Sequence, residues 1–306
     1  MLRSLILAAA RNQRVKHLVQ TAPLTRSVVR RYVAGEDLDD AVGVTAGLTA
    51  AGLSVSLDFL GEDTTDSAQA AATAETYTTL LRRLGDDGLT GGAELSVKLS
   101  AIGQKLDERL ALDHARQVCA AATRAGTTVT LDMEDHTTTD STLRVLADLR
   151  ADFPDTGAVL QAYLRRTESD CADLAHAGSR VRLCKGAYRE PPSVAYQSRT
   201  EVDRSYVRCL NVLMAGEGYP MVATHDPTLV AIAGERARWH GRKPGGYEYQ
   251  MLYGIRPDEQ RRLVAAGETV RVYLAFGTEW YGYLMRRLAE RPANLAFFLR
   301  SLVSTR

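Results

Sequence analysis

The chain has 306 residues, of which 45% are hydrophobic and 25% are charged. This length allows one large domain or two ordinary ones, and this composition is typical of a globular protein with a substantial core. Lys and Arg total 38 against 37 Asp and Glu, so the net charge of +1 argues against a dedicated nucleic-acid binder, which usually carries a marked basic excess.

The first residues predict helices rather than a membrane anchor. The apolar run Leu5–Ala10 is too short to span a bilayer. Apolar residues at helical spacing over 5–20 and 26–34 predict two helices, and Asp37 begins a third that ends at Gly52. We therefore expect residues 1–51 to form a helical segment that packs on the domain that follows. Four cysteines without a CxxC pair favour reduced thiols and a cytoplasmic location.

After Gly52 the chain alternates between short strands and helices. Runs rich in Val, Leu and Tyr appear eight times, at intervals of 22 to 42 residues, each long enough for one crossover helix. The eight predicted strands are centred near Val55, Val97, Val129, Val159, Val181, Val222, Tyr249 and Val272.

Capping residues mark the helices between these strands. We expect helices to begin at Asp66, Asp107, Asp140, a capping box of Thr167 with Asp170, Asp226 with Pro227, and Pro257. We expect helices to end at Gly85, Gly126, before Pro154, at Gly178 and at Gly267.

Eight strand–helix units over roughly 250 residues are typical of a (β/α)8 barrel. The alternative, an open doubly wound sheet, would need a glycine-rich turn after its first strand, and residues 58–62 contain no GxGxxG motif. The sequence therefore predicts a TIM-like α/β barrel over residues 52–306, with extra N-terminal helices over 1–51.

In such a barrel the catalytic side chains come from the C-terminal ends of the strands. The residues near those ends form a polar set: Asp58, Lys98, Asp132, Glu134, Asp135, His136, Gln161, Arg182, Lys185, Thr224, His225, Asp226, Gln250 and Tyr273. Only five of the 38 basic residues are lysine, so the presence of Lys98 and Lys185 in this set points to a function rather than to a solvated surface.

The residue types favour some chemistries over others. Only His136 and His225 lie near strand ends, without HxH or HExxH spacing, so we expect no metal site. A Schiff-base lysine stays open, because barrel aldolases need one desolvated lysine and Lys98 and Lys185 are both candidates. Several cations with few carboxylates favour an anionic substrate, a phosphate-bearing cofactor, or both.

The segment after the fifth strand adds a ligand-binding signal. Gly186 and Ala187 follow Lys185 directly, and small residues there let backbone N–H groups approach a ligand. The long loop that continues to Arg199 is either a lid or an ordinary surface connection.

Seven blocks, in one order, resemble the proline dehydrogenase family. They are 96–100 (SVKLS), 131–135 (LDMED), 161–164 (QAYL), 182–188 (RLCKGAY), 223–225 (ATH), 249–254 (YQMLYG) and 283–288 (YLMRRL). The resemblance implies FAD-dependent oxidation of L-proline to Δ1-pyrroline-5-carboxylate, the first step of proline degradation to glutamate. It also implies transfer of the electrons to a membrane quinone through peripheral contact with the inner face of the membrane. Because no aldehyde dehydrogenase half follows Arg306, we expect a single-function member with a separate pyrroline-5-carboxylate dehydrogenase.

The resemblance also implies a role for individual residues. Asp132 and Arg182 are implied to be catalytic. The residues implied to bind substrate are Lys98, Arg286 and Arg287 at its carboxylate, and Tyr188, Leu252, Tyr273 and Tyr283 around its ring. The residues implied to bind FAD are Met133, Gln161, Arg182, Lys185, Gly186, Ala187, Tyr188, Thr224 and His225.

Two alternatives belong to other classes of protein. One is a Schiff-base aldolase built on the same barrel. The other is a non-catalytic barrel that binds an amino acid and retains the carboxylate clamp.

Overall fold

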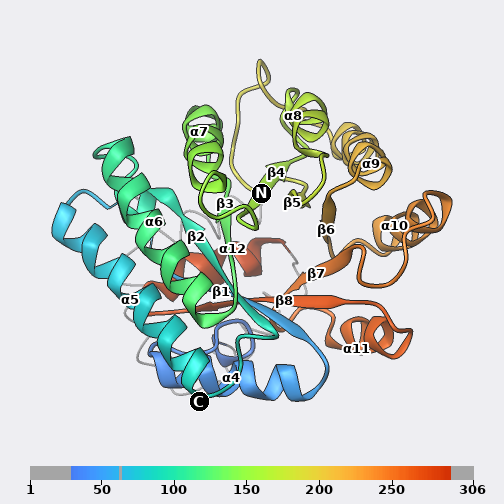
Figure 1. The fold of residues 1–306 in the computed structure, drawn as a ribbon. Coiled ribbons are helices and arrows are strands. Elements are labelled where there is room, and N and C mark those ends of the chain that lie inside the picture. The colour runs from blue at the N-terminus through green and yellow to red at the C-terminus, as the bar shows by residue number, and fades with distance from the viewer. Residues whose placement is uncertain (1–28, 62–63, 291–306) are drawn as a thin grey trace, which may run out of the picture.

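The computed structural model describes residues 29–61 and 64–290. The helix predicted over 5–20 lies outside these residues. Eight parallel strands pair in sequence order, and β8 pairs with β1 to close a barrel (Figure 1). The strands are β1 (Ser54–Phe59), β2 (Ala93–Lys98), β3 (Val129–Asp132), β4 (Gly157–Gln161), β5 (Arg180–Cys184), β6 (Tyr219–Ala223), β7 (Glu248–Leu252) and β8 (Val270–Phe276). The predicted barrel and all eight strand positions are confirmed.

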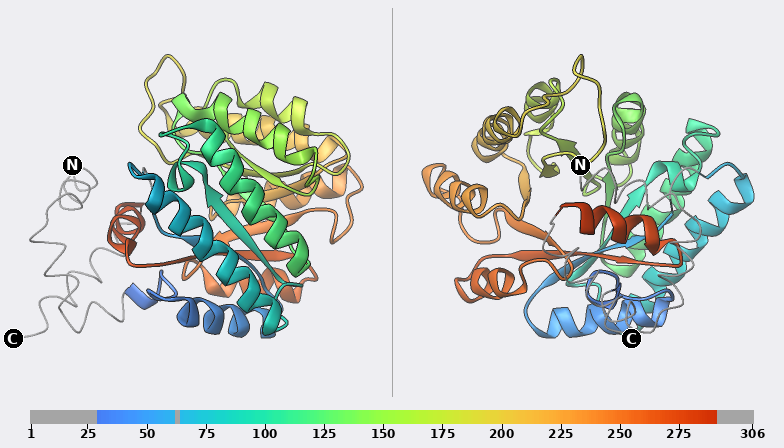
Figure 2. Two further views of the ribbon diagram at one scale, coloured as in Figure 1. Left: turned by 60° about the vertical axis from the view of Figure 1, so that its left-hand side comes forward. Right: turned by 180° about the vertical axis from the view of Figure 1, so that it is seen from behind.

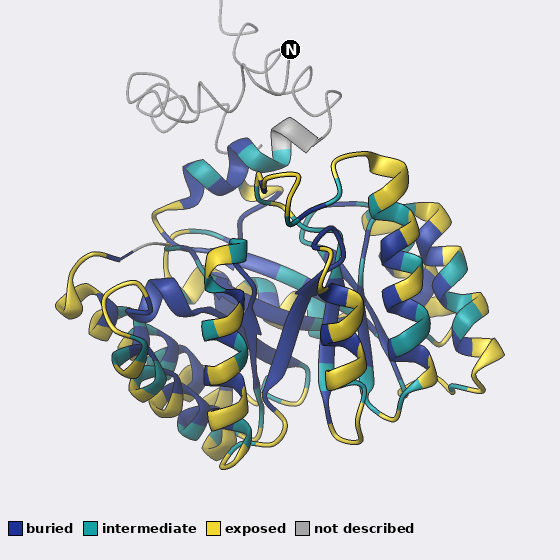
Figure 3. Cartoon of the chain, turned by 90° about the horizontal axis from the view of Figure 1, so that it is seen from above, coloured by how far each residue is buried: buried dark blue, intermediate teal, exposed yellow. Residues whose placement is uncertain are grey.

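The strands are buried between the barrel interior and the surrounding helices. Every residue of β2, β3 and β4 is buried, and the strands form the buried centre of the molecule (Figure 3). One set of alternating side chains, such as Leu57 and Val97, packs outward against the helices in an apolar core. The other set points into the barrel and is largely polar, with apolar residues such as Val159 and Met221 beside Arg182.

Helices cover the outside and one end of the barrel. They are α4 (Leu38–Ala50), α5 (Ser67–Asp86), α6 (Glu108–Ala125), α7 (Thr139–Arg150), α8 (Thr167–Leu174), α9 (Arg199–Ala215), α10 (Pro227–Trp239), α11 (Pro257–Ala265) and α12 (Trp280–Glu290), with short 3₁₀ turns η1 (Leu99–Ile102) and η2 (His136–Thr138). The carboxylates of Asp37, Asp66, Asp107 and Asp226 accept a backbone N–H at the first turn of their helices, as predicted.

Other predicted helix boundaries are wrong. Gly85 lies inside α5, which continues for one more residue. The capping box at Thr167 does not form, because its hydroxyl donates to the carbonyl of Gln161 (2.6 Å) and Asp170 pairs with Arg166 (2.9 Å). Tertiary partners therefore replace the local cap. The same helix ends at Leu174, before the predicted stop at Gly178.

The described part of the N-terminal segment packs on the barrel. Of the helix predicted for 26–34, the structure describes residues 29–34, in which residues 29–30 are helical and the chain then turns. The N–H of Ala34 donates to the carbonyl of Ala275 on β8 (2.9 Å). Gly254, after β7, has φ of +74°, and a Cβ there would lie 1.7 Å from the carbonyl oxygen of Arg31. Glycine is needed at this position because two backbone segments meet there.

Helix α12 crosses one end of the barrel. It follows β8 after a short turn and lies across the end where the strands finish (Figure 2). Its residues Trp280, Tyr283 and Leu284 form a buried cluster with Tyr32 and Val33 of the N-terminal segment. Among the described helices, none combines the length and the apolar character that a membrane span requires.

Candidate functional site

A lysine lies between two carboxylates at the end of the barrel that α12 crosses. Lys98 is the last residue of β2, and its Nζ lies 2.6 Å from Asp58 Oδ1 and 3.7 Å from Asp132 Oδ2. Lys98 and Asp132 are also register partners on neighbouring strands. The Tyr273 hydroxyl lies 3.5 Å from the ammonium nitrogen. Four residues from separate strands thus meet around one positive charge.

Both carboxylate oxygens of Asp132 have hydrogen-bond donors. Tyr273 donates to Oδ2 (2.7 Å), while Ser96 (2.7 Å) and Arg182 Nη1 (2.8 Å) donate to Oδ1. Burial raises the pKa of Asp132, but Lys98 and Arg182 outweigh burial, so the pKa lies below its ordinary value of 3.8. Asp132 therefore stays ionised and holds its three neighbours in place.

The pKa values of the adjacent groups fix their protonation states. Burial raises the pKa of Asp58 above its ordinary value even though Lys98 opposes this shift. Burial and the Asp132 charge raise the pKa of Tyr273 well above 10, so its phenol stays a hydrogen-bond donor.

Arg182 connects this cluster to the interior of the barrel. Its Nε donates to Gln250 Oε1 (2.5 Å), and its Nη2 donates to Ser56 (2.9 Å) and lies 3.3 Å from Glu94 Oε1. Its guanidinium carbon lies 5.3 Å from the centre of the Tyr273 ring.

Three of the polar residues do not stand at strand ends, which corrects the prediction. Arg182, Gln250 and Tyr273 lie within β5, β7 and β8, one layer deeper in the barrel than the strand ends. Their side chains still reach the cluster because they are long and point into the barrel.

A second layer of charges, which the sequence analysis missed, lies below Arg182. Glu94 pairs with Arg180 (2.5 Å), and Glu248 pairs with Arg271 (2.8 Å). Burial opposes ionisation of Glu94, but Arg271, Arg180 and Arg182 lower its pKa to about 2. The signal was present in the sequence, because each polar residue of this layer lies two or four positions before a residue of the predicted polar set on the same strand. Arg180 precedes Arg182, Glu248 precedes Gln250 and Arg271 precedes Tyr273 by two positions, and Glu94 precedes Lys98 by four.

Several candidate cofactor residues follow β3, β4 and β6. Met133 is buried directly after Asp132. Gln161, the last residue of β4, donates to the carbonyl of Glu134 (2.7 Å). Thr224 Oγ1 accepts the N–H of Asp226 (3.1 Å), and His225 Nε2 accepts the N–H of Leu252 (2.9 Å). Because Nε2 of His225 accepts this hydrogen bond, Nδ1 carries the ring proton.

The segment after β5 has the close packing expected for a ligand cradle. Lys185 Nζ lies 2.5 Å from Asp203 Oδ1 and 3.1 Å from Asp226 Oδ2. Gly186 has φ of +111°, and a Cβ there would lie 2.3 Å from the ring of Tyr163. Only glycine fits this position without a shift of the ring.

Tyr188 and Leu252 lie in different surroundings. Ala187 is exposed next to Gly186, whereas Tyr188 packs against the cluster of Tyr163, Leu164 and Ala195. The structure therefore places Tyr188 on the β5–α9 loop among these residues. Leu252, the last residue of β7, packs against the cluster that contains Tyr283.

The two arginines of α12 are half-buried rather than solvated. Tyr283 is buried, and the guanidinium carbon of Arg287 lies 5.1 Å from the centre of its ring. Arg286 is also partly covered. The helix that carries both cations crosses the same end of the barrel as the Lys98 cluster.

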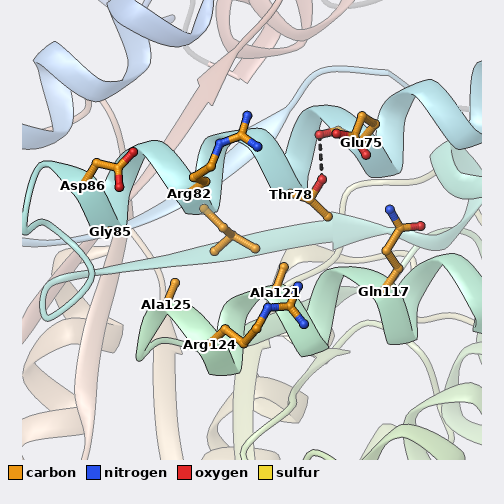
Figure 4. A pocket seen from close by; sticks show the side chains of 10 residues that line it. Glu75, Thr78, Arg82, Gly85, Asp86, Gln117, Ala121, Arg124 and Ala125 are labelled. Carbon is orange, nitrogen blue, oxygen red and sulfur yellow. Dashed lines mark hydrogen bonds between the residues drawn. The ribbon is translucent and has the colours of Figure 1, made fainter.

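A cavity on the outside of the barrel lies apart from the Lys98 cluster. A cavity of about 520 Å³ lies between α5 and α6 on the outside of the barrel (Figure 4). Its lining, which includes Arg82, Gln117 and Arg124, shares no residue with the cluster around Lys98. The described ranges hold no group of three or more His, Cys, Asp or Glu side chains arranged to bind a metal ion.

Comparison with known proteins gives the family. The family model described as proline dehydrogenase matches residues 41–300. Proline dehydrogenase 1 of Bacillus subtilis is 35% identical over 303 residues, which cover 99% of this chain and 99% of the relative. Proline dehydrogenase of Deinococcus radiodurans is 36% identical, with 98% and 97% covered. Among solved structures, proline utilization A from Bdellovibrio bacteriovorus has the same fold, with a TM-score of 0.81 at 23% identity, over 94% of this chain and 38% of that chain. The chain belongs to the proline dehydrogenase family.

Proposed function

We propose that this protein oxidises L-proline to Δ1-pyrroline-5-carboxylate with FAD as cofactor and passes the electrons to a membrane quinone. This is the first step of proline degradation. The observation that carries the proposal is the cluster of Lys98, Asp132, Tyr273 and Arg182, four residues from four strands that are joined through Asp132. Lys98, Asp132 and Arg182 lie in the blocks that resemble the family. Family membership supports the reaction class.

Cationic side chains would bind the substrate carboxylate. Lys98 offers an ammonium held in place by Asp58 and Asp132. Arg286 and Arg287 would approach from α12, and a planar guanidinium can pair with a carboxylate through two parallel hydrogen bonds. The aromatic and apolar side chains proposed around the proline ring are Tyr188, Leu252, Tyr273 and Tyr283.

The residues after β3, β4, β5 and β6 fit a flavin nucleotide. A dinucleotide needs cations for its pyrophosphate and backbone N–H groups that can approach closely. Lys185 supplies a cation beside Gly186. Because Gly186 has no side chain, its backbone is not covered by one, and the Tyr163 ring occupies the place where a Cβ would lie. Met133, Gln161, Arg182, Ala187, Tyr188, Thr224 and His225 complete the proposed FAD contacts.

Bound FAD would supply the hydride acceptor that no amino-acid side chain provides. The chain's own residues would then orient the substrate, and Asp132 is proposed to do so by fixing Lys98 and Tyr273. Holding the reacting carbon in one orientation contributes several kcal/mol to such a reaction. Arg182 is proposed to place its buried positive charge near the flavin ring, where a cation favours the reduced form.

The Schiff-base alternative is weaker at Lys98. A lysine nucleophile must lose its proton, and the nearby carboxylates of Asp58 and Asp132 stabilise the protonated amine. Lys185 likewise lies in ion pairs, with Asp203 and Asp226.

The domain bounds, the location and the partner enzyme are also proposed. We propose a catalytic barrel over residues 52–306 and an N-terminal helical segment over 1–51 that packs on it. Because the proposed electron acceptor is a membrane quinone, we also propose a cytoplasmic protein that makes peripheral contact with the inner face of the membrane. The product would pass to a separate pyrroline-5-carboxylate dehydrogenase, and no nucleic-acid partner is proposed.

A coupled assay tests this proposal. The purified full chain is incubated with L-proline and a soluble quinone analogue, while quinone reduction and the product imine are both measured. We expect both to rise in equal amounts and to depend on FAD content. Quinone reduction without imine, or neither signal from a protein with bound FAD, would contradict the proposed reaction.

A further inference from the structure

The long loop between β5 and α9 carries the proposed flavin cradle at its beginning. It comprises residues 185–198 and rises between α7 and α8 as the long yellow connection in Figure 1. Its first part contains Lys185, Gly186 and Ala187. The conformation of this first part therefore decides whether these three residues can meet a cofactor.

Backbone hydrogen bonds fix the loop at its two ends. The N–H of Tyr163 donates to the carbonyl of Lys185 (2.9 Å). Further along, the N–H of Arg165 donates to the carbonyl of Val194 (2.9 Å), and the N–H of Tyr196 donates to the carbonyl of Tyr163 (2.8 Å). Near the end of the segment between these anchors, the carbonyl of Pro191 accepts the N–H of Val194 (3.1 Å), and Arg165 donates to the carbonyl of Pro192 (3.3 Å).

A buried carboxylate holds this middle segment. Glu190 is only 7% exposed and points toward the connections after β3 and β4. Its Oε1 accepts the backbone N–H of His136 (2.9 Å) and lies 3.3 Å from the Tyr163 hydroxyl. Its Oε2 pairs with the ring Nδ1 of His136, and Gln197 Nε2 donates to the Glu190 carbonyl (3.2 Å). Burial of a carboxylate is costly unless several donors satisfy it, and the donors to this carboxylate come from two separate segments, the connections after β3 and β4.

Glu190 and Gly186 act on the same aromatic ring. Tyr163 contacts the Glu190 carboxylate through its hydroxyl, and its ring lies where a Cβ of Gly186 would be. The position of the ring therefore links the carboxylate to the cradle four residues earlier in the loop. Neither Glu190 nor His136 contacts Lys98 or Asp132 through any hydrogen bond described above.

We propose that Glu190 is a positioning residue for the flavin, because its carboxylate fastens the β5–α9 loop to His136 and Tyr163 and thereby sets the cradle at Lys185, Gly186 and Ala187. This inference rests on the proposed FAD function. It predicts that Glu190 controls retention of the flavin and ordering of the loop, and that it has little effect on binding of the substrate once flavin is present.

The principal variant is Glu190→Gln in the full-length protein, with Glu168→Gln as control. Glu168 pairs with Arg208 near the surface, so the control removes an ion pair of little energetic value. The dissociation rate of FAD is measured after dilution, and the KM for proline is measured at saturating FAD. For Glu190→Gln we expect flavin to leave about tenfold faster, which corresponds to about 1.4 kcal/mol, with KM changed less than about twofold. Unchanged flavin release, or a KM that rises as much as the release rate, would overturn the proposal.

Limited trypsin digestion reports the loop without relying on FAD. Lys185 and the exposed Arg189 are the cleavage sites within the segment. In Glu190→Gln the informative site is Lys185, because Glu190 itself follows Arg189 and its charge affects trypsin there directly. We expect cleavage at Lys185 to be several-fold faster in Glu190→Gln than in the parent or the control, with equal cleavage outside the loop. Equal cleavage at Lys185 in all three proteins would overturn the role of Glu190 in fastening the loop.

A milder variant covers the case in which Glu190→Gln does not fold. His136→Gln keeps the buried carboxylate and the backbone N–H donor while it removes the ring contact, and the ring is one-third exposed. It should accelerate both flavin release and loop cleavage in the same direction, by about threefold. Parental values for both measurements would contradict the proposal. Absence of flavin from the parent protein would instead overturn the proposed FAD function, and the digestion experiment would still test the loop.

Discussion

Tyr273 donates a hydrogen bond to Asp132 from within β8, and its ring faces the guanidinium of Arg182. Its phenol is held by these two charged neighbours, so it has little freedom to move aside. Sequence resemblance identified the residue, but its depth in the barrel and its contact with Asp132 required the structure.

Tyr273 gives a prediction about substrate choice. A ring hydroxyl on the substrate would need space that this phenol is proposed to fill, and overpacking typically costs about 1–3 kcal/mol. We expect L-proline to be preferred over trans-4-hydroxyproline by roughly ten- to a hundredfold in kcat/KM. Tyr273→Ser should narrow this ratio, mainly by slowing turnover of proline.

The variant Tyr273→Phe is the matched control because it keeps the ring and removes the hydrogen bond to Asp132. It should retain the preference for proline while kcat/KM falls. Equal kcat/KM for the two substrates in the parent protein would refute the proposed position of Tyr273.

Arg242 has a purely structural role that the sequence did not predict. Its guanidinium donates five hydrogen bonds to backbone carbonyls, which belong to Leu213, Met214, Gly216, Gly218 and Gly246. Several of these carbonyls lie at or just after the C-terminal end of α9, where helix carbonyls lack partners within the helix. No sequence pattern connects an arginine after α10 with acceptors about 25 residues earlier.

Arg242→Met should lower the free energy of unfolding by about 2–4 kcal/mol, because several half-buried carbonyls lose a charged donor. Urea unfolding at neutral pH measures this loss. Arg238→Met is the control, since Arg238 is exposed and pairs with Glu235 on the same helix, and it should change stability by less than about 0.5 kcal/mol. Equal effects of the two substitutions would refute the role of Arg242.

At the level of strands and helices, apolar periodicity predicts the strand positions, and aspartate caps predict where several helices begin. The strands were recognisable because their outward residues must pack against helices, and the Asp caps act through local hydrogen bonds. The capping box at Thr167 failed because tertiary partners took both side chains. The charged interior was overlooked because a barrel core is usually filled with branched apolar residues.

Helix α12 gives a prediction about the carboxylate clamp. Arg286→Met and Arg287→Met should each raise the KM for proline by roughly thirtyfold, about 2 kcal/mol, because a substrate carboxylate loses a half-buried cation. FAD content should be unchanged. The exposed Arg261 on α11 provides the control substitution Arg261→Met, which should leave KM as it is. Parental proline kinetics in both α12 variants would refute the clamp.

The buried charge layer between β2, β5, β7 and β8 gives a prediction about acid stability. The pKa of Glu94 is about 2 in the folded protein against an ordinary value of 4.5. The unfolded chain therefore takes up the proton first, so stabilisation by Glu94 is complete above about pH 4.5 and is lost as the pH falls toward 2. The drop from 4.5 to about 2 corresponds to about 3 kcal/mol in total.

Between pH 6 and pH 3.5, the parent protein should lose about 1 kcal/mol more unfolding free energy than Glu94→Gln. Glu94→Gln should also be less stable at pH 6, because Arg180 and Arg271 lose a buried partner. The exposed Glu217→Gln should lose as much on acidification as the parent does. An identical acid response in the parent and Glu94→Gln would contradict the assignment.

At the level of the whole molecule, the barrel brings together residues that lie far apart in the chain, as in the contact between Lys98 and Tyr273, which are 175 positions apart. The fold could be predicted because eight strand–helix units have few alternative arrangements. The contacts among Asp58, Lys98, Asp132 and Arg182 could not be predicted from the sequence, because they depend on strand register and on the direction of side chains inside the barrel. Helix α12 and the N-terminal segment complete the end of the barrel at which these residues lie.

Anaerobic titration of the purified full-length protein with L-proline tests the central claim most directly. The account predicts a protein with the visible absorbance of bound flavin, which L-proline bleaches in a ratio of about one equivalent per flavin. Tetrahydrofuran-2-carboxylate, which keeps the carboxylate and ring but has no amine to oxidise, should bind without bleaching. A yellow protein that L-proline never bleaches would contradict the proposed oxidation, and a colourless protein that traps a carbonyl substrate on lysine with borohydride would favour the aldolase instead.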